Sequence, residues 1–261
     1  MGIKITLAQT AELKKAIADY YGKNSKSRLK INISEYSDLL GLDHITNQMD
    51  ELMKLVHSDS EFNIEFMTKT ANIHNLLNYD GNKQVQVTFN INTPYVINKY
   101  EKGVSSLDEM ITAINALMQK GGYEILLAIE PIIKYKGYEE DYRALIQRIR
   151  MEIDLSQVSK IKVGTVRYKT RMKNYINKVH PNSGLLSPNQ KLVNPEKEDK
   201  RWRYSKEERI KIYSIIKNEL VDVPNVALEL GSENPELWDE LGLNKNDIHS
   251  GIVYQYIKKK K

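Results

Sequence analysis

The sequence predicts an α/β protein in which a strand–helix unit is repeated about six times. Short segments with strand-like alternation are each followed by a stretch whose apolar residues recur at helical spacing. The segment 124–129 is a nearly continuous apolar run, which is typical of a strand that is buried on both faces. Strands that alternate with helices imply right-handed crossovers and a parallel sheet. Both a doubly wound sheet and a barrel satisfy this pattern.

The elements are expected in the following order. Strands are predicted at residues 4–8, 29–34, 62–67, 85–91, 124–129 and 160–164. Helices are predicted at about 10–20, 45–56, 73–77, a short segment after 91, 106–120, 138–153 and a basic stretch that ends near 179. The pair Gly121-Gly122 is expected to end the helix that precedes it.

The composition changes after the last of these helices. Residues 181–200 are rich in Pro, Asn, Ser and charge, which is typical of a linker or an irregular arm. A helix at 205–220, a strand at 226–230 and a short helix around Trp238 are predicted beyond it. We therefore divide the chain into residues 1–183, which carry the repeated units, and residues 184–261, which carry a basic, aromatic arm and an α/β extension.

Composition excludes several kinds of site. The chain contains no cysteine, so it offers no disulfide, zinc–thiolate site or cysteine nucleophile. Its five histidines form no close pair at metal-ligand spacing, and no metal site is predicted. No segment reaches the roughly 18 apolar residues that a membrane span requires. The start of the chain lacks the apolar core of a signal peptide, and we expect a cytoplasmic protein without a membrane partner.

Polar residues follow the predicted strands. In a parallel sheet or a barrel, ligands bind at the carboxyl ends of the strands. The residues at those ends are Glu35, Lys69, Asn90 and Asn92, Glu130, and Arg167 with Tyr168. These side chains are the candidate site from geometry alone.

Cations and aromatic residues are interleaved after the last repeated strand. The set comprises Lys160, Lys162, Arg167, Lys169, Arg171, Lys173 and Lys178 with Tyr168 and Tyr175, and then Arg201, Trp202, Arg203 and Tyr204. This pattern suits phosphate contacts combined with base stacking, and the net charge of +5 agrees with a polyanionic partner. The competing interpretation is a solvated helix whose lysine stems cover apolar surface.

Several segments together resemble the spore photoproduct lyase family of radical-SAM enzymes in both order and spacing. The resemblance covers roughly residues 3–220, and the segments are 37–46, 66–69, 89–92, 99–107, 128–133, 137–142 and 201–204. It implies a partial (β/α) barrel. Such enzymes bind a [4Fe–4S] cluster through C-x₃-C-x₂-C, and the cluster cleaves S-adenosylmethionine (AdoMet) to a radical that repairs a thymine dimer in spore DNA.

Two departures from the family pattern are serious. The region with the cluster cysteines is expected upstream of Ile3 and is missing, so the barrel would lack its first strand or strands. The family's hydrogen-donor cysteine falls at Glu35, and a carboxylate cannot donate a hydrogen atom as a thiol does. Glu35 therefore marks the catalytic position without its usual chemistry.

Other positions of the family pattern carry suitable residues. Ser37 and Lys69 fall where the family contacts AdoMet, and Asn90 replaces a serine at a third contact. Arg203 and Tyr204 fall where the family holds the damaged DNA. With Arg167 and Lys169 from the basic stretch, they form the predicted nucleic-acid surface.

An open barrel exposes unpaired backbone groups that favour aggregation unless another segment covers them. We expect a second polypeptide there, either a cluster-bearing subunit or another copy of this chain; a third option is that segment 226–230 folds back over the gap. The leading prediction is the AdoMet- and nucleic-acid-binding part of a split or degenerate lyase-like enzyme, which takes a [4Fe–4S] cluster only from a partner. The alternative is a non-catalytic module for binding nucleic acid or protein.

Overall fold

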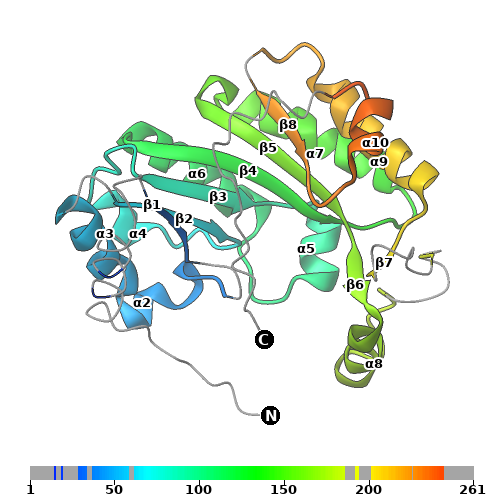
Figure 1. The fold of residues 1–261 in the computed structure, drawn as a ribbon, viewed down its shortest axis with the longest axis horizontal. Helices are drawn as coiled ribbons and strands as arrows, with labels where there is room; N and C mark the ends of the chain where they lie inside the picture. The colour runs from blue at the N-terminus through cyan, green and yellow to red at the C-terminus, as the bar shows by residue number, and fades with distance from the viewer. Residues whose placement is uncertain are drawn as a thin grey trace.

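A single six-stranded parallel sheet organises the protein (Figure 1). The computed structural model describes residues 29–33, 37–58, 62–185, 192–193, 201–224 and 226–243, together with Lys15 and Asp19. The strands, in spatial order, are β1 (Leu29–Asn32), β2 (Phe62–Thr68), β3 (Val85–Asn90), β4 (Tyr123–Ile132), β5 (Val158–Thr165) and β8 (Ala227–Leu230). All five pairings between neighbours are parallel.

Helices connect these strands. They are α2 (Asp43–Thr46), α3 (Gln48–Ser58), α4 (His74–Leu77), α5 (Pro94–Tyr100), α6 (Leu107–Lys120), α7 (Tyr138–Glu152), α8 (Thr170–Val179), α9 (Lys206–Leu220) and α10 (Pro235–Glu240), with 3₁₀ turns at Leu40–Leu42 and Leu155–Gln157. Local chemistry fixes their ends. Ser106 and Glu109 form a reciprocal capping box at the start of α6, and Gly121 follows its last residue with φ of 77°.

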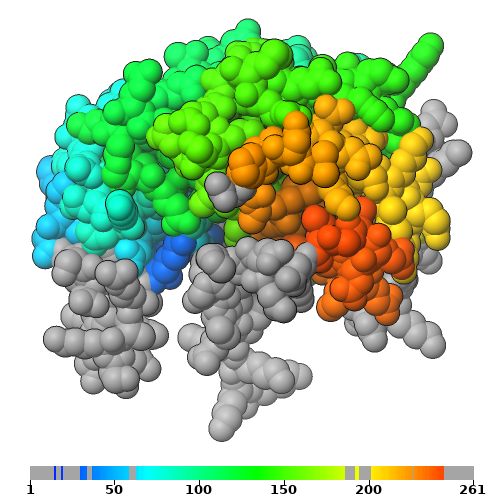
Figure 2. Space-filling model, turned by 90° about the horizontal axis from the view of Figure 1, so that it is seen from above, coloured from blue at the N-terminus to red at the C-terminus, as the bar shows by residue number. Residues whose placement is uncertain are grey.

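The strand order distinguishes between the two architectures that the sequence allowed. A doubly wound sheet reverses its strand order at a switch point, whereas here the strands follow one another across the sheet in chain order. Right-handed crossovers in a constant direction put their helices on one face, as in a barrel. Figure 2 shows the same progression on the surface, from blue and cyan on one side to orange and red on the other. The α/β barrel-type fold is confirmed, and the barrel is not closed.

The two faces of the sheet differ in chemistry. One face carries the apolar core, to which α3, α6, α7 and α9 contribute buried side chains. Its fully buried strand residues include Ile64, Val87, Phe89, Leu127 and Ile161. The opposite face carries polar residues in the alternate positions, such as Lys30, Glu65 and Lys160, which form ion pairs across neighbouring strands. Only one face is therefore built to be covered by helices.

The last strand lies at the far edge of the sheet. Strand β8 pairs with β5, in the register Lys160 to Ala227 and Val163 to Leu230. Segment 226–230 was one of the three options for covering the gap of the barrel, and in the structure it extends the β5 edge of the sheet and leaves the β1 edge uncovered by it. Strand β8 comes from the 184–261 part of the chain and so extends the sheet that β1 to β5 form. The predicted strand at 4–8 lies outside the described residues.

A two-stranded ribbon departs from the sheet and was not predicted. Strands β6 (Arg167–Lys169) and β7 (Arg201–Arg203) pair in an antiparallel manner, with Tyr168 opposite Trp202. Helix α8 follows β6, and none of its residues is buried. Figure 1 shows α8 extending away from the sheet below the ribbon. The basic stretch therefore forms a projection rather than another crossover.

Candidate functional site

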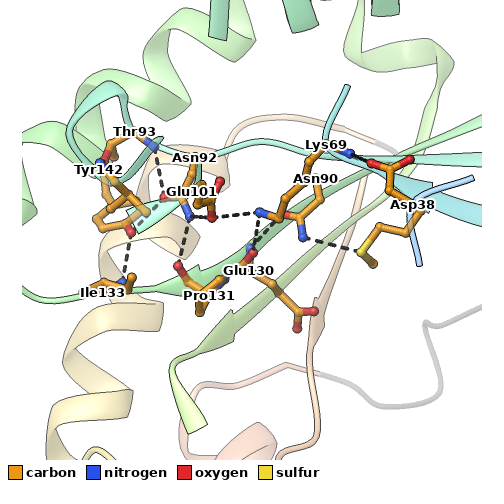
Figure 3. Close-up of polar contacts among 12 residues, drawn as sticks. Asp38, Lys69, Asn90, Asn92, Thr93, Glu101, Glu130, Pro131, Ile133 and Tyr142 are labelled. Atoms are coloured by element: carbon orange, nitrogen blue, oxygen red, sulfur yellow. Dashed lines mark hydrogen bonds and ion pairs between the residues drawn. The ribbon is translucent and has the colours of Figure 1, made fainter. Parts of the chain in front are cut away.

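Polar residues at or near the carboxyl ends of β2, β3 and β4 meet at one edge of the sheet (Figure 3). Lys69 lies at its centre. Its Nζ donates to Oε1 of Glu101 at 2.8 Å and to the main-chain carbonyl of Glu130 at 3.1 Å. The Lys69 side chain is 26% exposed and that of Glu101 is 10% exposed. One cation thereby links the ends of two strands to the segment that follows α5.

Asp38 fixes the loop after β1 against the end of β2. Its Oδ2 accepts the backbone N–H of Lys69 at 2.7 Å, and its Oδ1 accepts the hydroxyl of Thr68 at 2.9 Å. The same carboxylate accepts the N–H of Leu40 at 3.1 Å. Ser37, a predicted AdoMet contact, precedes this anchor and is exposed. Glu35, the predicted catalytic position, lies outside the described residues.

Asn92 connects this site to the core. Its Nδ2 donates to the carbonyl of Pro131 at 2.9 Å, and its Oδ1 accepts the Tyr142 hydroxyl at 3.0 Å. That hydroxyl also accepts the N–H of Ile133 at 3.0 Å. Burial raises the pKa of Tyr142 well above its usual value, because a phenolate would lose its hydration there. Tyr142 therefore stays neutral, and its hydroxyl donates a hydrogen bond to Asn92.

Asn90 contacts the same strand ends from β3. Its Oδ1 accepts the N–H of Glu130 at 3.2 Å, and its Nδ2 lies 3.4 Å from the sulfur of Met67. The structure therefore brings Lys69 and Asn90 together through the main chain of Glu130, as the strand-end reasoning predicts. Their contact with AdoMet stays a prediction.

Glu130 places an incompletely satisfied carboxylate at this edge. Among the described residues, its buried Oε1 has no hydrogen-bond partner, while its Oε2 lies 3.9 Å from Nζ of Lys162. Figure 3 shows the carboxylate pointing away from Lys69 and Asn90. The site therefore has two sides, one around Lys69 and one around Glu130.

The predicted nucleic-acid residues lie on and beside the β6–β7 ribbon. The rings of Tyr168 and Trp202 are stacked, with centroids 6.5 Å apart and planes at 7°. The Nζ of Lys173 lies 5.2 Å from the centroid of Trp202. Lys169 is exposed, and Arg167 donates from Nη1 to the carbonyl of Gly231 at 3.3 Å. Cations and aromatic rings are thus interleaved in space as well as in sequence.

Arg203 and Tyr204 contact the interior instead. Nη2 of Arg203 lies 2.6 Å from Oε2 of Glu233, whose side chain is 1% exposed. Tyr204 is fully buried, and its hydroxyl accepts the N–H of Lys134 at 2.9 Å. In the described structure these two residues hold the base of the ribbon against the body, and their contact with nucleic acid stays a prediction.

The residues present suit AdoMet better than a cluster. AdoMet carries a carboxylate group, and this edge offers the ammonium of Lys69 as a partner for it. A thiolate-ligated cluster does not fit, because the chain contains no cysteine. In the described part of the chain, no group of three or more His, Cys, Asp or Glu could hold a metal ion. No described helix is long and apolar enough to cross a membrane.

Sequence reasoning did not assign a role to Asp38, Glu101 or Glu233. Asp38 and Glu101 lie within segments that carry the family resemblance, so that resemblance was the signal that could have identified them. Glu233 gives no signal in the sequence. Its importance arises because the chain returns to β5 and brings this carboxylate to Arg203 and Arg209.

Comparison with known sequences identifies one family. The spore photoproduct lyase family model matches residues 4–228. Spore photoproduct lyase of Bacillus subtilis is 31% identical over 133 residues, which are 51% of this chain and 39% of that protein. The enzyme of Clostridium acetobutylicum is 27% identical over 184 residues, which are 70% of this chain and 54% of that protein. The chain therefore spans about half or less of the length of these curated relatives.

Solved structures agree in fold. Spore photoproduct lyase carrying a substitution, with a dinucleoside spore photoproduct, superposes with a TM-score of 0.74 at 21% identity, over 85% of this chain and 67% of that one. A doubly substituted form with bound AdoMet and the same dinucleoside gives 0.73 at 22% identity, over 84% and 66%. The family match over residues 4–228 and this shared fold lead to one conclusion: the chain belongs to the spore photoproduct lyase family.

Proposed function

We propose that this chain is the AdoMet- and nucleic-acid-binding part of a lyase-like radical-SAM protein whose [4Fe–4S] cluster comes from another polypeptide. The observation that carries the proposal is the meeting of Lys69, Asn90 and Glu130 at the strand ends, beside a basic and aromatic ribbon. In a barrel-type fold this edge is where ligands bind.

Lys69 and Asn90 support AdoMet as the ligand on one side of the site. Both belong to strand ends that the Glu130 main chain joins, and a relative of the same fold is described with AdoMet bound. The Lys69 ammonium already pairs with Glu101, so an anionic group of the ligand would compete for it. Ser37 would contribute a hydroxyl from the loop after β1.

Nucleic acid is the proposed ligand on the other side of the site, where the β6–β7 ribbon and α8 lie. The ribbon and α8 carry Arg167, Lys169, Arg171, Lys173 and Lys178, and α8 contains no acidic residue. Phosphate neutralisation by such a surface releases counterions and stabilises the complex. Relatives of the same fold are described with a dinucleoside spore photoproduct. A DNA strand bearing a thymine lesion is therefore the proposed substrate.

The cluster would require a second chain. A protein without cysteine cannot provide thiolate ligands, and β1 is the end strand of the sheet among the described residues. A cluster-bearing subunit would pair with this edge, and a second copy of the chain is the competing partner. Co-expression with a C-x₃-C-x₂-C protein should yield a complex that contains iron and sulfide in fixed ratio. If the chain stays monomeric and free of iron in every such co-expression, the proposal of a cluster-bearing partner is contradicted.

The AdoMet site is tested by calorimetric titration of the purified chain and its variants. Lys69→Met should weaken AdoMet binding roughly tenfold, since it removes a charged hydrogen-bond donor. Lys120→Met is the matched control, because Lys120 is an exposed lysine at the end of α6. Equal affinities for the wild type and both variants would reject the assignment of Lys69.

The nucleic-acid surface is tested by the salt dependence of binding to single-stranded DNA. Lys169→Glu should weaken binding to all sequences and reduce the slope of log K against log salt by about one. Lys120→Glu provides the same charge change at a remote exposed position. An unchanged slope for Lys169→Glu would reject the ribbon as the binding surface.

A non-catalytic binding protein is the second candidate function. The absence of cysteine favours it, because both the cluster ligands and a thiol hydrogen donor are missing from this chain. It shares the nucleic-acid surface with the first proposal but requires neither AdoMet nor iron. AdoMet titration with and without the candidate partner distinguishes the two.

A further inference from the structure

One oxygen of the Glu130 carboxylate is buried. Oε1 is enclosed and lacks a hydrogen-bond partner among the described residues, although the side chain as a whole is 16% exposed. Burying a polar atom without a partner is costly, and such atoms are rare in native structures. An unsatisfied acceptor at a ligand-binding edge indicates that a donor arrives with the ligand.

Two glycines make room for this oxygen. A Cβ on Gly164 would lie 2.2 Å from Oε1 of Glu130, and one on Gly231 would lie 2.0 Å from it. Gly164 belongs to β5 and Gly231 directly follows β8, so neighbouring strands both leave space at the same point. Neither position needs glycine for its backbone conformation, since neither φ lies in the left-handed region. The missing side chains therefore serve the placement of the carboxylate.

The surroundings of Glu130 point to the nucleic-acid side of the site. Its carboxylate turns away from Lys69 and Asn90 (Figure 3). Arg167, the first residue of the ribbon, donates to the carbonyl of Gly231 at 3.3 Å, and Lys162 lies 3.9 Å from Oε2 of Glu130. The carboxylate therefore lies at the base of the basic ribbon, with a cation nearby.

A carboxylate is an unusual group for a polyanion to meet. It repels phosphate and becomes favourable only when it accepts a hydrogen bond from the edge of a base. Bases that leave the stack to enter a pocket are recognised by such contacts to the Watson–Crick edge. We infer that Glu130 reads a nucleobase of the bound strand by accepting its N–H, namely the N3–H of thymine. This inference rests on the nucleic-acid binding proposed above.

The test compares two oligonucleotides by fluorescence anisotropy at fixed salt. One is a single-stranded thymine dodecamer, and the other is the same strand with N3-methylthymine, which lacks the donor. The wild type should prefer the first by roughly tenfold, as expected for a hydrogen bond to a charged group. Glu130→Ala should remove this preference by weakening only the unmodified complex.

Charge repulsion between Glu130 and the phosphates alone predicts a different result for Glu130→Ala. If Glu130 merely repels the strand, then Glu130→Ala should tighten both complexes equally and leave their ratio unchanged. Glu124→Ala is the matched control, since Glu124 lies on the same face at the other end of β4. Glu130→Met keeps most of the side-chain volume without an acceptor oxygen, so it should lose the preference as Glu130→Ala does, and it replaces the alanine variant should that variant fold poorly.

The glycines provide an independent variant. Gly164→Ala should displace the flexible end of Glu130 rather than the backbone, because the close atom belongs to the carboxylate. It should therefore reproduce the loss of preference seen in Glu130→Ala while Glu130 itself remains. Equal binding of the two oligonucleotides by the wild type, or a preference that survives in Glu130→Ala, would overturn the inference. Absence of binding to either strand would instead reject the proposed nucleic-acid function, and the inference with it.

Discussion

The ion pair of Lys69 with Glu101 gives a quantitative prediction about the site. Its side chains are 26% and 10% exposed, and Nζ lies 2.8 Å from Oε1. Breaking a buried pair costs roughly 3–5 kcal/mol, whereas an exposed pair contributes roughly 0–1 kcal/mol. The intermediate exposure leads us to expect that Lys69→Met lowers the free energy of unfolding by about 2 kcal/mol.

Most of this loss should come from the carboxylate that is left behind. After Lys69→Met, the described contacts of the Glu101 carboxylate are reduced to a 3.3 Å hydrogen bond from Nδ2 of Asn92. Changing Glu101 to Gln in the same protein removes the uncompensated charge, so the double variant should recover about 1 kcal/mol.

Urea unfolding of the wild type, both single variants and the double variant measures this coupling. Lys211 and Glu139 provide the control pair, because their side chains are 57% and 30% exposed and should couple by less than about 0.5 kcal/mol. If the Lys69 and Glu101 effects add within about 0.3–0.5 kcal/mol, the pair contributes nothing specific and the reasoning is refuted.

Three further predictions concern the supports of the fold. Tyr142→Phe should lower the free energy of unfolding by about 2 kcal/mol in urea, since it leaves the N–H of Ile133 without its acceptor; a change below about 0.5 kcal/mol would contradict this. Asp38→Ala should make the 37–42 loop exchange its amide protons faster, because the N–H groups of Leu40 and Gly41 lose an acceptor; unchanged exchange rates would reject Asp38 as the anchor of this loop. Lys54 and then Tyr79 lower the pKa of Asp50 from its ordinary value of 3.8, so its stabilisation is present above that value and is lost as the pH falls further. The urea midpoint of Asp50→Asn should therefore fall less steeply with decreasing pH than that of the wild type. Parallel plots of midpoint against pH for the two proteins would count against the pairing of Asp50 with Lys54 and Tyr79.

The repeated strands were predictable because their signal is local. Residues 62–67 and 85–91 alternate, and 124–129 are apolar, so each strand could be located from its own sequence. The structure confirms β2, β3 and β4 within a few residues of these ranges. The strand-end rule then placed Lys69, Asn90 and Glu130 at one edge without knowledge of their contacts.

The ribbon could not be predicted in the same way. Strands β6 and β7 have three residues each, which is too short for a periodic pattern, and each is a strand only because the other pairs with it across more than thirty residues of chain. The sequence placed Arg203 in the predicted nucleic-acid surface, and only the fold shows that its guanidinium contacts Glu233.

The sequence by itself determined the α/β class, the absence of thiolate chemistry and the identity of the polar residues at the strand ends, because composition and periodicity are properties of the chain. Tertiary structure alone decided that the strands lie in chain order across an open sheet, and that Glu101 pairs with Lys69. It also decided that Gly164 and Gly231 enclose an oxygen of Glu130 that has no hydrogen-bond partner in the described part of the chain. These features depend on contacts between residues that are distant in sequence, and packing, rather than local propensity, selects such contacts.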